Sequence, residues 1–158
     1  MPKITNNVIR LLETHHARFT AFEVPPEKLS AIEIAKILMV DPSLIYKTIV
    51  ITREEKAKPI LAVVSGNSEV DLKKLAKVVG DKKVFLSTEH EAEQITGLLA
   101  GGISPLALFN KGFIVILNES SREQQEIFIS GGQRGLIIRL PVEKFIELTY
   151  AQVALIQK

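Results

Sequence analysis

The feature that most restricts the fold is a pair of apolar, β-branched runs separated by a short charged segment. The runs cover residues 46–52 and 59–65, and the connecting residues 53–58 are mostly charged. Runs of this length and composition favour β-strands, and a short polar connection favours antiparallel pairing of the two runs that it joins. We therefore predict a β-hairpin in this part of the chain.

Helix and strand patterns alternate irregularly around this hairpin. Capping residues and amphipathic stripes predict helices at residues 5–15, 30–39, 71–80 and 88–95, a helix that begins at 141, and a final helical turn. Short apolar runs predict further strands at residues 18–24, 83–86, 113–117, 126–130 and 136–140. Because this order is not a regular βαβ alternation, we expect an α+β fold: a single domain over residues 1–158, with a mixed, curved β-sheet approaching a barrel and helices around it.

Composition narrows the class of protein. The chain has 158 residues, of which 46% are hydrophobic and 24% charged, so it can bury a core of its own. It contains no cysteine, which excludes disulfides, thiolate nucleophiles and thiolate metal sites. Residues 1–7 lead into no signal-peptide core, and no apolar run approaches the roughly 18 residues of a membrane span. We expect a cytoplasmic protein with no membrane partner.

Lys47 stands out because it interrupts the first apolar run of the hairpin. A charged side chain is costly to bury in such a strand, so a ligand that uses its charge is one explanation. The other is an edge-strand lysine whose ammonium reaches solvent, and the residues alone do not decide between the two. Tyr46 and Lys47 point to opposite faces of the strand, so only one of them can line a given pocket. The ammonium is the better partner for a phosphate or for a carbonyl oxygen that gains charge.

Two glycine-rich stretches are the other candidates for chemistry. They are Gly101-Gly102-Ile103-Ser104-Pro105 and Ser130-Gly131-Gly132-Gln133-Arg134-Gly135. Adjacent glycines let backbone N–H groups approach a ligand closely and converge on an oxyanion or a phosphate. Taken alone, however, each stretch is better explained as an ordinary tight turn.

Other catalytic signatures are missing from the sequence. Its histidines, His15, His16 and His90, lack the spacing of a metal site. There is also no nucleophile elbow, no P-loop and no G-x-G-x-x-G after a strand. We therefore expect no metal and no cofactor.

Positive charge gathers in one part of the chain although the net charge is only +2. The residues concerned, here called the lysine cluster, lie around the predicted helix at 71–80 and the turn after it: Lys73, Lys74, Lys77, Lys82 and Lys83. A solvated helix face explains such a cluster, and so does an anionic partner.

Four segments become informative when they are taken together. They are Ile45-Tyr46-Lys47-Thr48, the run from Val70 to Lys77, the stretch from Thr96 to Pro105, and the stretch from Ser130 to Gly135. In this order, over about 90 residues, they resemble the YbaK/EbsC branch of the prolyl-tRNA editing-domain family. Four ordered segments are a specific signal, unlike any one of them alone.

The resemblance implies a free-standing enzyme that hydrolyses mischarged tRNA, typically Cys-tRNA(Pro). Its partners would be the acceptor end of the tRNA and, as a second candidate, prolyl-tRNA synthetase. The catalytic residues that it implies are Lys47, Gly101 and Gly102. The substrate-binding residues that it implies are Tyr46, Thr48, Phe22, Leu29, Ile103, Ser104, Pro105, Ser130, Gly131 and Gly132. Contacts to tRNA would come from the lysine cluster and Arg134.

The likeness is incomplete at two places that bear on substrate choice. Members with the cysteine-editing pattern often have an acidic residue just after the Arg-Gly-Leu of the last turn, where this chain has Ile137. The segment around Phe22 and Leu29 also matches only loosely. The amino acid that is removed therefore stays open. The alternative function is a non-catalytic tRNA-binding or regulatory module that acts with prolyl-tRNA synthetase.

Overall fold

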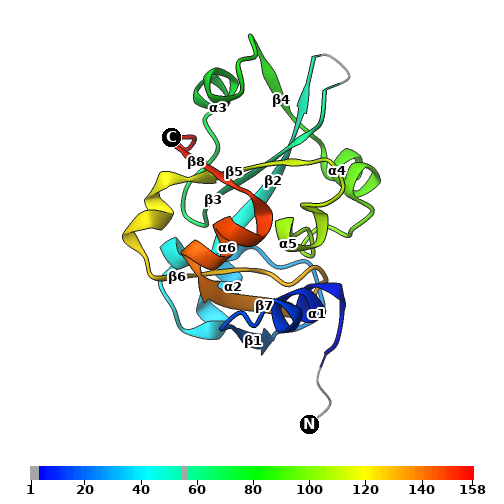
Figure 1. Ribbon diagram of the computed structural model, residues 1–158, viewed down its shortest axis with the longest axis vertical. Helices are drawn as coiled ribbons and strands as arrows, with labels where there is room; N and C mark the ends of the chain where they lie inside the picture. The colour runs from blue at the N-terminus through cyan, green and yellow to red at the C-terminus, as the bar shows by residue number, and fades with distance from the viewer. Residues whose placement is uncertain (1–3, 55–56) are drawn as a thin grey trace.

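The predicted hairpin forms the longest pair of strands in the protein. A computed structural model describes residues 4–54 and 57–158. Strands β2 (Tyr46–Arg53) and β3 (Ile60–Ser65) pair antiparallel, with Tyr46 opposite Ser65 and Ile51 opposite Ile60 (Figure 1). Residues 55 and 56 of the predicted charged connection lie outside the described residues. The hairpin prediction is confirmed.

The hairpin is the middle of a five-stranded mixed sheet. Its strand order is β4 (Val84–Leu86), β2, β3, β5 (Ile114–Asn118) and β8 (Gln152–Ala154). The β4–β2–β3 part is antiparallel, whereas β3 with β5 and β5 with β8 pair parallel. Every residue of β3, the central strand, is buried, which explains its unbroken apolar sequence.

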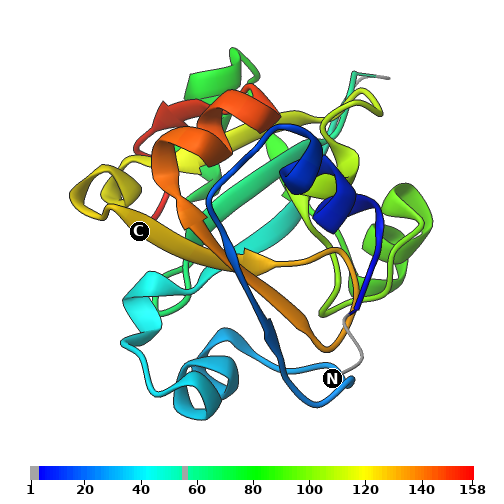
Figure 2. The same ribbon diagram turned by 60° about the horizontal axis from the view of Figure 1, so that its bottom comes forward.

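A second, antiparallel sheet has the order β1 (Thr20–Glu23), β7 (Leu136–Pro141) and β6 (Glu126–Ser130). In Figure 1 it lies below the hairpin, and Figure 2 brings its strands to the front. One bridge between Ile45 and Phe128 joins the two sheets just before β2 begins. The α+β prediction is therefore confirmed, with two sheets that do not close into a barrel within the described part of the chain.

Helices cover the outside of the sheets where capping and apolar spacing predict them. They are α1 (Asn7–Thr14), α2 (Ala31–Leu38), α3 (Leu72–Val79), α4 (Glu89–Thr96) and α6 (Val142–Thr149). Ser30 with Glu33 and Thr88 with Glu91 form capping boxes at the starts of α2 and α4. These two helix starts matter below because both face the same cleft.

Two short elements differ from the prediction. The segment expected as a final helical turn contains β8, whose three residues pair with β5. A strand this short is stabilised by its neighbour and leaves no pattern of its own in the sequence. The second difference is α5 (Pro105–Leu108), a helix capped by Ser104 at the end of a stretch for which the sequence predicts only a turn. Single 3-10 turns, η1 (Pro42–Leu44) and η2 (Glu119–Glu123), complete the described elements.

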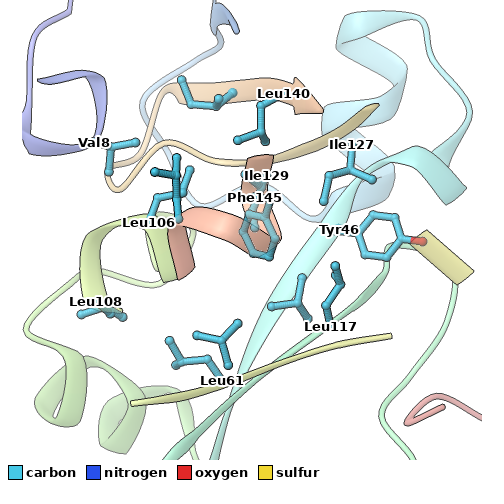
Figure 3. Close-up of a cluster of buried hydrophobic side chains, with 14 of the residues drawn as sticks. Val8, Tyr46, Leu61, Leu106, Leu108, Leu117, Ile127, Ile129, Leu140 and Phe145 are labelled. Carbon is cyan, nitrogen blue, oxygen red and sulfur yellow. The ribbon is translucent and has the colours of Figure 1, made fainter. Parts of the chain in front are cut away.

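The two faces of β2 pack into different parts of the core. Tyr46 and Val50 belong to a cluster that includes Phe145 of α6 and residues of both sheets (Figure 3). Ile51, on the opposite face, packs with Leu75 of α3 in a separate cluster. Because side chains alternate along a strand, Lys47 lies on the Ile51 face, opposite Tyr46.

One edge of β2 is left open over most of its length. Strand β4 pairs with β2 only from Ile51 to Arg53, and the Val50 carbonyl accepts from the backbone N–H of Ser87 at 3.2 Å. No described strand pairs with that edge between Lys47 and Ile49. The open edge borders the candidate site.

Candidate active site

A cleft of about 510 Å³, here called the main cleft, opens beside the free edge of β2. Its walls come from β2, the starts of α2 and α4, the first glycine turn, and the adjoining ends of β6 and β7. Much of the lining is apolar: Leu29, Ile34, Ile45, Ala92, Ile103 and Ile137. The cleft is therefore assembled from segments that lie far apart in the sequence.

Lys47 lies where the main cleft meets a second hollow, here called the side groove. The side groove runs past the start of α3 to Lys158. Lys47, Ile49 and Leu86 line both hollows. Lys47 is half-buried, and no ion pair of the described residues involves it. An unpaired ammonium at this junction can act on a ligand in either hollow.

The neighbours of Lys47 on β2 use their side chains differently. Tyr46 lines the main cleft as Lys47 does, so the prediction that only one of the two lines a given pocket is wrong. The Tyr46 side chain is 2% exposed, and its hydroxyl shares a hydrogen bond of 2.7 Å with Ser120, which is outside the cleft lining. Burial raises the pKa of Tyr46, so its phenol stays neutral. Thr48 lines the main cleft, and its buried Oγ1 has no hydrogen-bond partner among the described residues. Because this oxygen is buried, it is not exposed to a ligand in the cleft.

The first glycine stretch forms a tight turn from Leu99 to Gly102, closed by a 2.8 Å hydrogen bond from the Gly102 N–H to the Leu99 carbonyl. Gly101 has a φ of +89°, which is typical of the third position of a type II turn. Gly101 and Ile103 line the main cleft.

The second glycine stretch packs against the first. A Cβ on Gly102 would lie 2.8 Å from the Cα of Gln133. Ser130 lines the main cleft, and its Oγ accepts from the Gly132 N–H at 3.3 Å. Gly131 is not part of the lining, and neither is Gly132. The two predicted stretches thus lie together, but only some residues of each line the main cleft.

Several residues that the resemblance implies for the pocket lie behind it or away from it. The Ser104 hydroxyl accepts from the Leu106 N–H as the cap of α5, and both Ser104 and Pro105 are buried outside the lining. Phe22 is also outside it, 5.7 Å from the ring of Phe128 between centroids and under the guanidinium of Arg139. These three residues support the fold around the site, which corrects the expectation that they line it.

The lysine cluster is divided among several hollows. Lys73 lines the side groove and also a third hollow, here called the lysine groove, together with Lys82 and Lys83. Lys74 donates to the Gln157 carbonyl at 3.2 Å. Lys77 lies in the last turn of α3 and belongs to neither groove. Three of the five predicted lysines therefore follow a path that begins at Lys47.

Two sets of charged contacts near the main cleft were not predicted from the sequence, although Arg134 itself was expected to contact tRNA. Lys28, before α2, forms an ion pair with Glu89 at the start of α4. Glu93, on the same helix, accepts from the Ala100 N–H at 2.7 Å, and Arg134 donates through Nε to the Ala100 carbonyl at 2.6 Å. The residues in these contacts are not separated by a helical or strand spacing, so no local sequence pattern predicts the contacts.

Metal-binding chemistry finds no support in the described residues, because no group of three or more His, Asp or Glu side chains lies close enough to hold an ion. In the same residues, no helix has both the length and the apolar character needed to span a bilayer.

Comparison with known proteins identifies the family. Residues 25–148 match the model of the aminoacyl-tRNA editing domain. The chain belongs to this family. The resemblance drawn from four segments is thereby confirmed.

Relatives of two kinds support this membership. The chain is 38% identical over 150 residues to EbsC of Enterococcus faecalis, a candidate Cys-tRNA(Pro)/Cys-tRNA(Cys) deacylase, and the match covers 94% of this chain and 90% of that protein. It is 35% identical over 86 residues to a proline–tRNA ligase of Aquifex aeolicus, a likeness that covers 54% of this chain and only 13% of the ligase.

A solved structure agrees over the whole length. The crystal structure of a candidate trans-editing enzyme for prolyl-tRNA synthetase superposes with a TM-score of 0.79 at 26% identity and covers 99% of each chain. The two-sheet α+β architecture is therefore that of this editing-domain family.

Proposed function

We propose that this editing-domain protein acts in trans as a deacylase that removes the amino acid from a mischarged tRNA, with Cys-tRNA(Pro) as the first substrate to test. The observation that carries the proposal is Lys47, half-buried at the junction of two hollows and without an ion-pair partner in the described residues. A cation in this state favours an anionic ligand. The similarity to EbsC of Enterococcus faecalis supports the choice of substrate.

In the proposed complex the aminoacyl group occupies the main cleft and the terminal nucleotide extends toward the side groove. Lys47 then binds the terminal phosphate or ribose, since it lines both hollows. The apolar lining around Ile103 and Ile137 receives the amino-acid side chain.

The reaction needs positioning more than a protein nucleophile. Water attacks the ester carbonyl carbon, the bond to the ribose oxygen breaks, and the proton of the water passes to that oxygen, which leaves free amino acid and uncharged tRNA. For a cysteinyl substrate, its own thiol is a second candidate nucleophile: attack on the ester carbon expels the ribose oxygen, which takes the thiol proton, and the cyclic thioester that forms is then hydrolysed by water to free cysteine. An aminoacyl ester is already activated, so orientation and stabilisation of the oxyanion suffice. The backbone N–H of Gly101 is the proposed oxyanion donor, because the Gly102 N–H is used by the Leu99 carbonyl and Gly102 lies outside the cleft lining. One such donor is worth about 100-fold to 1000-fold in rate.

Replacement of Lys47 by alanine tests the proposal. Purified wild-type and Lys47→Ala proteins are incubated with labelled Cys-tRNA(Pro) and Ala-tRNA(Pro), and release of the amino acid is followed with time. We expect the variant to lose at least about 100-fold in kcat/KM, because substrate is neither anchored nor polarised. Its free energy of unfolding should change by less than about 1 kcal/mol, because Lys47 has no ion-pair partner among the described residues.

Lys36→Ala is the matched control, since Lys36 is an exposed lysine on α2 outside the main cleft. Full activity of Lys47→Ala would overturn the assignment of Lys47. If wild type binds tRNA but releases no amino acid, with or without prolyl-tRNA synthetase, the non-catalytic module becomes the better explanation.

The path of the tRNA is proposed to follow the side groove into the lysine groove. The two grooves share Leu72 and Lys73, and Lys82 and Lys83 extend the positive charge beyond them. Phosphate contacts of this kind release counterions, so each one steepens the salt dependence of binding.

Charge reversal separates the lysines on this path from the rest of the cluster. We expect Lys82→Glu with Lys83→Glu to weaken tRNA binding and to reduce the slope of log affinity against log salt by about one for each phosphate that is no longer neutralised. Lys77→Glu, on α3 but outside both grooves, is the control. Equal effects of the two changes on the salt slope would place the tRNA on another surface.

A further inference from the structure

The backbone of Ala100, the residue before Gly101, is held on both sides by side chains of opposite charge. The Ala100 N–H donates to the Glu93 carboxylate at 2.7 Å, and the Ala100 carbonyl accepts from Nε of Arg134 at 2.6 Å. Ala100 is 9% exposed, whereas Glu93 and Arg134 are both half-buried. Hydrogen bonds to charged groups are stronger than neutral ones, and these two act on the backbone of a single residue.

This arrangement fixes the orientation of the central peptide of the turn. Four-residue turns of types I and II differ mainly in the orientation of the central peptide, which is here the one between Ala100 and Gly101. The φ of +89° at Gly101 belongs to type II. By holding the Ala100 carbonyl, Arg134 keeps the peptide in that orientation.

The orientation decides where the next N–H points. None of the described peptide bonds is cis, and in a trans peptide the carbonyl and the following N–H point in opposite directions. The Gly101 N–H therefore lies on the side of the turn away from Arg134, and Gly101 lines the main cleft. The hydrogen bonds formed within residues 4–54 and 57–158 include none from this N–H, so it is free to bind a ligand.

We propose that Arg134 is a positioning residue, which fixes the peptide between Ala100 and Gly101 so that the Gly101 N–H is presented to the oxyanion of the substrate. This inference rests on the proposed function. It gives Arg134 a role different from the tRNA contact that the family resemblance implies, because its Nε is already committed to the turn. Glu93 is the second support, acting on the other side of Ala100.

Charge and geometry make different demands at this position, which allows a sharp test. A phosphate contact needs only a positive charge, whereas orientation of the peptide needs the planar guanidinium at the right reach. Arg134→Gln and Arg134→Lys should therefore be impaired alike. Arg10→Gln, on α1 and bonded within that helix to Asn7, is the control for loss of a surface arginine.

Steady-state deacylation and amide NMR of the free protein are measured for each variant. We expect both Arg134 variants to lose about 10-fold to 100-fold in kcat, with KM and the salt slope of tRNA binding unchanged. Glu93→Gln, which keeps an oxygen acceptor, should lose less. The Ala100 and Gly101 amide resonances should shift in the Arg134 variants and stay in place in Arg10→Gln.

The outcomes separate this inference from the proposed function. Recovery of kcat in Arg134→Lys together with a reduced salt slope in Arg134→Gln would overturn it in favour of a phosphate contact. Unchanged kcat despite shifted amides would also overturn it. If wild type deacylates nothing, the proposed function fails. Unchanged Ala100 and Gly101 resonances in Arg134→Gln would then overturn the positioning role as well. Shifted resonances would uphold the structural part of the inference, that Arg134 orients this peptide.

Discussion

The two glycine turns look alike in the sequence and differ in what surrounds each glycine. In the turn from Leu99 to Gly102, Gly101 lines the main cleft, and Glu93 and Arg134 hold the backbone of the preceding Ala100. In the second turn, a Cβ on Gly131 would meet the side chain of Leu136, and one on Gly132 would meet Val8. The first turn presents backbone to the cleft, and the second packs beneath it.

The difference teaches that a glycine-rich stretch has no fixed chemical meaning. Both stretches need glycine for a left-handed φ, at Gly101 in the first and at Gly132 and Gly135 in the second. The second stretch also needs room for its glycines against neighbouring side chains. Gly102 joins the two, because its missing side chain lets the turns touch. Adding one methyl group at Gly102, where the turns touch, and in a separate variant at Gly132, which packs on Val8, tests this comparison.

Gly102→Ala should have the largest effect. The new Cβ would lie 2.8 Å from the Cα of Gln133 and 2.9 Å from the backbone nitrogen of Arg134. Backbone atoms cannot rotate away as a side chain can, so the two turns must separate. We expect a decrease of about 3 kcal/mol in the free energy of unfolding, measured by urea denaturation.

Gly80→Ala is the matched control for this change. Gly80 ends α3 with a φ of +78°, and an added Cβ would have nothing within 4 Å. Gly80→Ala should therefore lower the free energy of unfolding only through backbone strain, by about 1 kcal/mol. Gly102 has no left-handed φ, so Gly102→Ala should lower the free energy of unfolding only through steric overlap. If Gly102→Ala were no more destabilising than Gly80→Ala, the two turns would not be packed together in solution.

Features with a local cause could be predicted from the sequence. The hairpin follows from two β-branched runs, and the opposite placement of Tyr46 and Lys47 follows from strand alternation. Capping residues determine the start of α2, where Ser30 and Glu33 form the expected box. The order of four segments was enough to identify the family.

Features that depend on contacts between distant segments could not be predicted. The bond from Arg134 to the Ala100 carbonyl spans 34 positions, and nothing in the neighbourhood of either residue signals it. Ser104 illustrates the same limit, because a serine before a proline in a glycine-rich stretch is equally compatible with a pocket wall and with the helix cap that it forms. Local patterns specify the elements; contacts between the elements select which residues face the cleft.

Gly132→Ala tests the supporting role of the second turn and should have a smaller effect than Gly102→Ala. Gly132 has a φ of +92°, and the added Cβ would lie 2.8 Å from Cγ2 of the buried Val8. We expect a decrease of about 2 kcal/mol in the free energy of unfolding, part from the left-handed backbone and part from displacing Val8. Val8→Ala removes the second part, so a double-mutant cycle should give a coupling of about 1 kcal/mol.

Activity of the same variant then separates support from participation. Since Gly132 does not line the main cleft, kcat of the folded Gly132→Ala protein should remain within about threefold of wild type when assayed well below its unfolding transition. The decrease in stability would then come without a decrease in turnover, the reverse of what is expected for Arg134→Gln. A fall in kcat as large as that of Arg134→Gln would mean that Gly132 reaches the substrate, and the two turns would share one role after all.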